Sequence, residues 1–136
     1  AEWMNIANVD FTIAHPKGYD LAPEFAGNAK ICYDPQEAFI GADYIYAKNW
    51  SSFEDYGKIL SSDPAWTVSK AKMDLTNNAK FMHCLPVRRN VVVDDEVIDS
   101  ENSIVIQQAG NRLWAAQAVL KEILLTQMRV ESPYLF

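Results

Sequence analysis

The sequence has few of the residues that build metal and disulfide sites. Its 136 residues include 2 cysteines and 2 histidines. Two cysteines are too few for a disulfide framework, and two thiols alone make a poor zinc site. We therefore predict that Cys32 and Cys84 are reduced thiols and that the protein uses no metal and no cofactor.

A block of basic residues and a long apolar run are also lacking. The 18 acidic and 12 basic residues give a formal net charge of -6 at pH 7, which argues against a broad nucleic-acid interface. No apolar run approaches the roughly 20 residues that a membrane helix needs, and the N-terminus has no signal-peptide pattern. We predict a cytoplasmic protein whose partners are small molecules or proteins, not membranes or nucleic acids.

What the sequence does contain is typical of one compact α/β domain. Hydrophobic residues make up 49% and charged residues 22% of the chain, the balance of a protein that can bury a core. β-branched and aromatic runs alternate with capped, periodic segments, which predicts a parallel sheet flanked by helices. The expected strands are 8–16, 29–34, 42–50, 79–85 and 103–108. The expected helices are 20–28, 34–42, 67–78, 94–100 and 111–128.

The residues that follow the strands are the candidates for a site, because ligands of a parallel sheet gather at the carboxyl ends of its strands. Lys48 follows an apolar run, where a lysine either reaches water or binds a ligand. His15 has no acidic or thiol neighbour close by in the sequence and is interpreted as structural. The polar, unperiodic segment 51–66 is interpreted as a functional loop. The expected strand ends are 14–16, 47–50, 83–86 and 107–112.

His83 and Cys84 stand side by side at one of these strand ends. A thiolate–imidazole dyad needs facing side chains, whereas neighbours on a strand point to opposite faces. The alternative is a small buried cysteine beside a core histidine with satisfied hydrogen bonds. Pro86 fixes the chain direction after the strand and leaves the carbonyl groups of Cys84 and Leu85 without ladder partners. Those carbonyls are then available to an ammonium or amide group of a ligand.

Three arginines near the later strand ends are candidates for anion binding. Arg88 and Arg89 follow the proline turn, and a guanidinium suits a carboxylate or a phosphate. A solvated surface charge is the alternative for each. Arg112 is expected to open the last helix, where a positive charge opposes the helix dipole and so lacks a local stabilising role. The apolar positions Trp114, Ile123, Leu124 and Met128 have helical spacing and are interpreted as core or interface.

Three motifs occur in a fixed order: "YAKNW" (residues 46–50), "HCLPVRRN" (83–90) and "NR" (111–112) before a long helix. In this order they resemble the second, amino-acid-binding half of the ornithine transcarbamylase family. The lysine-containing tryptophan segment and the paired arginines resemble the branch that carbamoylates N-acylated ornithine, and within it the enzymes for N-succinylornithine. The implied fold is the second domain of the aspartate/ornithine transcarbamylase fold, incomplete at its N-terminus. The implied domain is 1–136, with the carbamoyl-phosphate-binding domain absent.

The resemblance implies a role for five residues. Cys84 and Arg112 would be catalytic, and together with Leu85 they would bind carbamoyl phosphate. Lys48, Leu85 and Arg88 would bind the N-acylornithine, with Arg88 on the succinyl carboxylate. Acetylornithine and plain ornithine are alternative substrates. The acetyl branch can carry a lysine where this chain has Val92, which speaks against the acetyl substrate.

The implied reaction is attack of the δ-amine of the substrate on carbamoyl phosphate, in arginine biosynthesis, by an enzyme that works as a homotrimer. Such a reaction needs positioning and an oxyanion partner and no metal. The family's phosphate loop and its His-Pro-Cys-Gln segment occur nowhere in the sequence, so we expect these 136 residues to be inactive alone. A non-catalytic binding module with the same fold is the alternative from another functional class.

Overall fold

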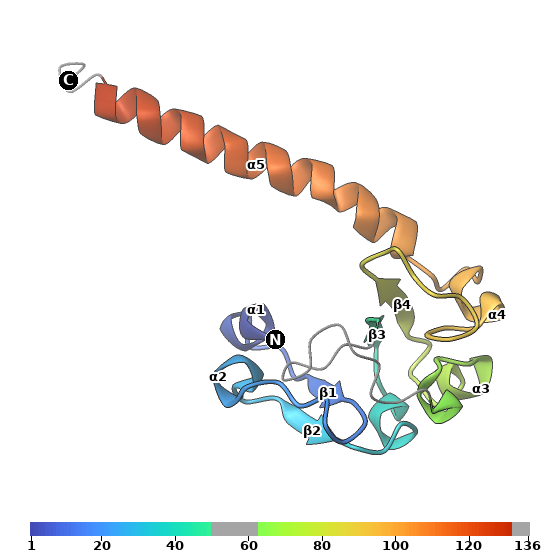
Figure 1. Cartoon of the computed structure of the whole chain (residues 1–136). Helices are drawn as coiled ribbons and strands as arrows, with labels where there is room; N and C mark the ends of the chain where they lie inside the picture. Colours follow the sequence, from blue (N-terminus) through green and yellow to red (C-terminus); the bar gives the residue numbers. More distant parts are fainter. Residues whose placement is uncertain (50–62, 132–136) are drawn as a thin grey trace.

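The computed structural model describes residues 1–49 and 63–131, with side chains up to residue 127 (Figure 1). The predicted loop 51–66 therefore lies largely outside the described residues, as do Trp50 of the "YAKNW" motif and the side chain of Met128. The elements are α1 Glu2–Ile6, β1 Thr12–Ala14, α2 Pro23–Ala26, β2 Lys30–Cys32, η1 Glu37–Phe39, β3 Tyr44–Ala47, η2 Pro64–Trp66, α3 Lys70–Met73, β4 Lys80–His83, α4 Asp95–Ile98 and α5 Val105–Glu131. None of the described helices is long and apolar enough to cross a membrane.

The four described strands form two parallel pairs. β1 pairs with β2, and β3 pairs with β4. Helices α1 and α2 lie beside the first pair, while α3 and α4 lie beside the second (Figure 1). The predicted parallel arrangement of strands with flanking helices is thus confirmed.

The core lies on one face of the β3–β4 pair. Along β4, Phe81 and His83 are fully buried, whereas Lys80 and Met82 are half-buried. On β3, Tyr44 and Tyr46 are exposed. Alternation of this kind is expected when one face of a strand pair packs against other elements. The buried apolar residues that form the cluster are Phe39, Val68, Phe81, Val93, Val97, Ile98 and Val105.

The predicted strand at 103–108 is wrong. Only Ser103 forms an isolated parallel bridge, with Phe81, and Ile104 donates its N–H to the Phe81 carbonyl at 2.9 Å. From there the chain turns into α5, because Val105 enters the core and the Gln108 N–H bonds to the Ile104 carbonyl at 2.9 Å. Tertiary packing overrides the strand propensity of this β-branched run.

Helix α5 begins at Val105 and extends away from the rest of the protein (Figure 1). Every side chain from residue 110 to residue 127 is exposed. Trp114, Ile123 and Leu124 are 68%, 51% and 51% exposed, so their interpretation as core residues is wrong for this chain. The interpretation of these positions as an interface stays a prediction.

Asp34 precedes the 3-10 helix η1 and accepts hydrogen bonds from the N–H groups of Gln36 and Glu37 at 2.7 and 3.0 Å. Helix α2 begins after Ala22 without a side-chain cap.

Gly27 ends α2 with a φ of 57°, a left-handed conformation that glycine adopts without strain. The backbone here approaches α1 closely. A Cβ at this position would lie 2.2 Å from the Asn5 Nδ2 atom, and the Asn28 N–H donates to Asn5 Oδ1 at 3.2 Å. Glycine therefore lets the loop after α2 pack against α1.

Candidate functional site

The parallel pairing of β3 and β4 brings two of the predicted strand ends together. Ala47 is the register partner of His83, so Lys48 and Asn49 leave the pair beside Cys84 and Leu85. A hydrogen bond of 3.0 Å from Asn49 Nδ2 to the Pro86 carbonyl ties the two ends. The "YAKN" and "HCLP" segments therefore form one edge of the protein.

His83 is the last residue of β4 and Cys84 follows it directly, so their side chains are expected to point to opposite faces. His83 is 0% exposed, whereas Cys84 is exposed. The two side chains therefore form no nucleophile–base dyad, and the alternative of a buried Cys84 is wrong. Cys32 and Cys84 are both free thiols, as predicted.

The turn after β4 is held by side chains of both strands. Leu85 has a φ of 42°, a left-handed conformation that costs a non-glycine residue free energy. Its N–H donates to Nδ1 of His83 at 3.0 Å, while Asn49 binds the next carbonyl. Among the described residues, none donates a hydrogen bond to the carbonyl oxygen of Cys84 or Leu85. The predicted lack of ladder partners for both carbonyls is therefore confirmed within the described residues.

The imidazole of His83 is kept neutral by its surroundings. Burial lowers its pKa from the ordinary value, and the positive charge of Lys48 lowers it further. A neutral imidazole has one acceptor nitrogen and one N–H. Since Nδ1 accepts the Leu85 N–H, the proton belongs on Nε2. That atom is buried and has no hydrogen-bond partner among the described residues, so the prediction of a satisfied core histidine holds for only one of its nitrogens.

Tyr46 interacts with both Cys84 and Gln108. Burial raises the pKa of the Tyr46 hydroxyl, and the neighbouring Cys84 side chain raises it further, whereas a hydrogen bond with Gln108 opposes the shift. The first turn of α5 is thereby placed next to the end of β4. Sequence reasoning assigned no role to Tyr46, Asn49 or Gln108. Asn49 and Gln108 lie within the predicted strand ends, so that signal could have found them. Their contacts, however, are visible only in the folded structure.

The two adjacent arginines have different surroundings. Arg89 is held by ion pairs to Asp95 and Asp99, which raise the pKa of the guanidinium. Arg88 is half-buried, and no carboxylate of the described residues pairs with it. Arg89 is thus a structural residue that fastens the turn to α4, while Arg88 forms no such ion pair with a described residue.

Arg112 and Lys48 are exposed cations, and neither forms an ion pair within the described ranges. Arg112 does not open a helix, because α5 begins at Val105 and Arg112 lies about two turns in. The predicted conflict with the helix dipole is therefore wrong, since that effect fades within the first turn. Arg112 follows Gln108 by one turn on the same helix. Lys48, by contrast, lies directly beside the turn after β4.

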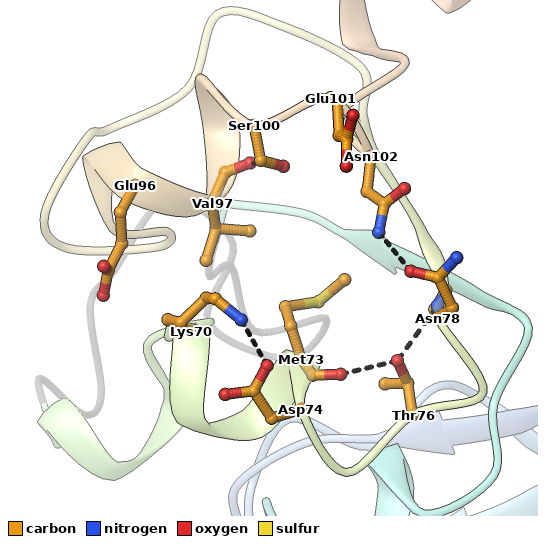
Figure 2. Close-up of a pocket in the computed structure, with 11 residues that line it drawn as sticks. Lys70, Met73, Asp74, Thr76, Asn78, Glu96, Val97, Ser100, Glu101 and Asn102 are labelled. Atoms are coloured by element: carbon orange, nitrogen blue, oxygen red, sulfur yellow. Dashed lines mark hydrogen bonds and ion pairs between the residues drawn. The ribbon is translucent and has the colours of Figure 1, made fainter.

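A polar pocket of about 420 Å³ lies at the opposite end of β4, between α3 and α4 (Figure 2). None of the predicted site residues lines it. Its polar groups bond to one another: Asn102 Nδ2 donates to Asn78 Oδ1 at 2.7 Å, and Lys70 pairs with Asp74. These contacts stabilise the start of β4 and do not converge on a ligand position.

The described residues contain no cluster of three or more histidine, cysteine or acidic side chains that could hold a metal ion.

The other histidine of the chain, His15, is buried just after β1. Its Nδ1 lies 2.8 Å from the Pro16 carbonyl, and its Nε2 lies 3.8 Å from Asp20 Oδ1. Asp20 is an acidic neighbour that the sequence reasoning did not anticipate, and the contacts fit the structural role predicted for His15.

Comparison with known sequences finds carbamoyltransferases for N-succinylornithine, N-acetylornithine and ornithine. The chain is 59% identical, over 91% of its length, to an N-succinylornithine carbamoyltransferase of Bacteroides thetaiotaomicron, of which it covers 40%. It is 43% identical, over 67% of its length, to an N-acetylornithine carbamoyltransferase of Xylella fastidiosa, of which it covers 29%. The chain therefore spans less than half the length of these curated relatives.

Comparison with solved structures agrees. The crystal structure of an acetylornithine transcarbamylase complexed with acetylcitrulline matches 82% of this chain and 39% of its own, with a TM-score of 0.71 and 35% identity. The family model of the aspartate/ornithine carbamoyltransferase Asp/Orn binding domain matches residues 1–123. With its parallel strand pairs and flanking helices, the chain belongs to the aspartate/ornithine carbamoyltransferase family and matches its amino-acid-binding domain.

Proposed function

We propose that these residues form the amino-acid-binding part of an N-succinylornithine carbamoyltransferase. The enzyme would transfer the carbamoyl group of carbamoyl phosphate to the δ-amine of N-succinylornithine, in arginine biosynthesis. The contrast between Arg88 and Arg89 carries the choice of substrate. Arg89 is occupied by two aspartates, while Arg88 is half-buried beside the turn without a carboxylate partner among the described residues.

The charges at the strand ends fit this substrate. Free ornithine has an α-ammonium group, for which a carboxylate is the natural partner, whereas N-succinylornithine has lost that charge and gained a carboxylate. Lys48 and Arg88 are both cations on the edge formed by β3 and β4. A guanidinium can bind a carboxylate with two parallel hydrogen bonds. We assign Arg88 to the succinyl carboxylate and Lys48 to the amino-acid part of the substrate.

The turn after β4 and the first turns of α5 would serve carbamoyl phosphate. The carbonyls of Cys84 and Leu85 can accept hydrogen bonds from its amide group, and Arg112 can approach its oxyanion. Transfer then requires the δ-amine to be held against the carbonyl carbon, with phosphate as the leaving group. The described residues supply part of this positioning. We propose that the remainder comes from a carbamoyl-phosphate-binding domain in a longer, homotrimeric, cytoplasmic protein.

Val92 bears on the acetyl alternative. This position is 1% exposed, and the Val92 N–H donates to the Arg88 carbonyl while its own carbonyl accepts from Val68, both at 2.9 Å. An apolar side chain in the core cannot offer a charged contact to a substrate. This supports the succinyl substrate over the acetyl one.

The experiment is a substrate panel on the longer protein in which we propose that residues 1–136 lie. We expect N-succinylornithine to be used with a higher kcat/KM than N-acetylornithine or ornithine. Arg88→Ala should lower the ratio of kcat/KM for N-succinylornithine to kcat/KM for N-acetylornithine by about tenfold or more. A charge-assisted hydrogen bond contributes roughly 1.5–3 kcal/mol, which corresponds to that factor. Arg88→Lys should recover part of it, because the charge remains and the planar fork is lost.

Arg89→Ala is the matched control, since it removes the neighbouring charge without touching the proposed carboxylate site. It should lower kcat/KM for all three substrates by a similar factor. Equal losses for the succinyl and acetyl substrates in Arg88→Ala would contradict the assignment. The isolated 136-residue chain should form no citrulline derivative. If both the 136-residue chain and the longer protein bind these ligands without catalysing carbamoyl transfer, the protein is the non-catalytic binding module.

A further inference from the structure

A histidine next to the proposed ligand-binding turn has no role in the reaction described above. His83 is 0% exposed and lies at the end of β4. One of its nitrogens contacts the backbone of the turn, and the other is buried without a partner among the described residues. Burying a polar side chain of this kind costs free energy unless hydrogen bonds compensate for its lost hydration.

We propose that His83 is a positioning residue: its neutral imidazole accepts the Leu85 N–H at Nδ1 and so fixes the turn that directs the Cys84 and Leu85 carbonyls toward ligand. The hydrogen bond of 3.0 Å has the length of an ordinary N–H···N contact. The part of this role that concerns ligand rests on the proposed function. The contact itself does not.

The conformation of Leu85 shows why such a contact is needed. Its φ of 42° lies in the left-handed region, where a branched side chain is disfavoured without support from its surroundings. Leu85 is also where β4 has ended, so its N–H has no ladder partner. An acceptor that is rigidly buried in the core satisfies the N–H and selects this conformation. The bond from Asn49 to the Pro86 carbonyl supports the turn from the other strand.

The surroundings of His83 keep it an acceptor. Protonation would turn Nδ1 into a donor and oppose it to the Leu85 N–H. Burial and the charge of Lys48 both lower the pKa of His83, so the imidazole stays neutral near pH 7. The same lysine that we assign to substrate therefore also favours the neutral imidazole.

The first test needs only the wild-type 136-residue chain, labelled with 15N. Long-range 1H–15N correlation spectra distinguish the two tautomers of a neutral histidine. We expect His83 to carry its proton on Nε2 at pH 7. His15 is the internal control, because its Nδ1 lies 2.8 Å from a carbonyl oxygen and must carry a proton. In one spectrum, Nδ1 should thus carry a proton in His15 and none in His83. A charged His83, or one protonated on Nδ1, would overturn the proposal.

The second test compares two substitutions of the same residue. In His83→Asn the side-chain oxygen can take the place of Nδ1, whereas in His83→Gln the longer side chain carries its oxygen toward the position of Nε2. Hydrogen exchange of the Leu85 amide should be about tenfold faster in the glutamine variant, the factor expected for the loss of one hydrogen bond. Equal exchange in both variants would count against a positioning role. Because neither readout needs substrate, an inactive longer protein would count against the proposed function alone.

Discussion

The strand pair β3–β4 and the helix α5 both contain many apolar residues, but those near the strand pair are buried and those on α5 are exposed. Phe81 and Val93, in and near the strand pair, are 0% exposed, while Leu113 and Trp114 on α5 are 59% and 68% exposed. Apolar content therefore leads to burial only where the topology provides a second surface. β3 and β4 have each other and helices α3 and α4, whereas the side chains of α5 from residue 110 to residue 127 are all exposed.

This difference also separates two kinds of residue in the proposed site. Around the strand ends, His83 and Asn49 are fixed by hydrogen bonds within the fold. Arg112 on α5 is exposed and forms no hydrogen bond or ion pair with a described residue. The first group can be preorganised by this chain alone. The second depends on whatever α5 packs against, since a helix with exposed apolar residues along its length gains stability mainly from packing.

The largest effect should come from a cavity in the strand region. Phe81→Ala removes a fully buried aromatic side chain and should lower the free energy of unfolding by about 3–5 kcal/mol, enough to leave much of the chain unfolded. Leu113→Ala on α5 should change it by less than about 0.5 kcal/mol. Urea denaturation followed by tyrosine and tryptophan fluorescence measures both. Similar losses for the two variants would mean that α5 is packed in solution.

A proline in α5 tests the same contrast from the helix side. Ala118→Pro should cost the helix about 3 kcal/mol locally, because the ring removes an N–H and clashes with the preceding turn. We expect a weaker circular dichroism signal at 222 nm, because helix content falls. The melting temperature of the strand region, followed by near-UV circular dichroism, should not change. The matched control is Ala118→Ser at the same exposed position. A lowered near-UV melting temperature would contradict the independence of the two regions.

The two arginines after β4 should differ in stability as well as in selectivity. Arg89→Ala breaks contacts to Asp95 and Asp99 and should lower the melting temperature by a few degrees, because exposed ion pairs are weak individually but here two converge on one guanidinium. Arg88→Ala should leave it unchanged. Calorimetry of the 136-residue chain measures both. A loss in Arg88→Ala equal to that in Arg89→Ala would show that Arg88 is structural.

The smallest effect concerns pH. His83 has a pKa of about 6.5 in the unfolded chain and a lower pKa in the folded chain. Between the two values the unfolded chain binds more protons, so stability is complete above about pH 6.5 and decreases as the pH falls toward the folded value. His83 contributes at most one proton to the difference in bound protons between the unfolded and the folded chain. His83→Asn should remove this contribution to the pH dependence of the free energy of unfolding, measured by urea titrations between pH 5 and 7.5. A pH profile identical to that of the wild type would mean that the folded pKa of His83 is not lowered.

Much of the architecture could be predicted from local sequence. Strand ends at Ala14, Ala47 and His83 follow from β-branched and aromatic runs that stop at proline or polar residues. The run 103–108 misled because its β-branched residues have strand propensity, and only contact with Phe81 and burial of Val105 show that it turns into a helix. Propensity is local, whereas that choice depends on the partner surface.

The sequence by itself determined the family resemblance, the parallel arrangement and the strand end that carries Cys84, Leu85 and Arg88, because these depend on residue type and order along the chain. Only the tertiary structure decided which of two adjacent arginines pairs with the aspartates of α4 and its C-terminal end, and which nitrogen of His83 contacts the turn. Arg88 and Arg89 are chemically identical, and their difference arises from where α4 places Asp95 and Asp99. Such choices depend on distances between segments far apart in the chain, which no local pattern encodes.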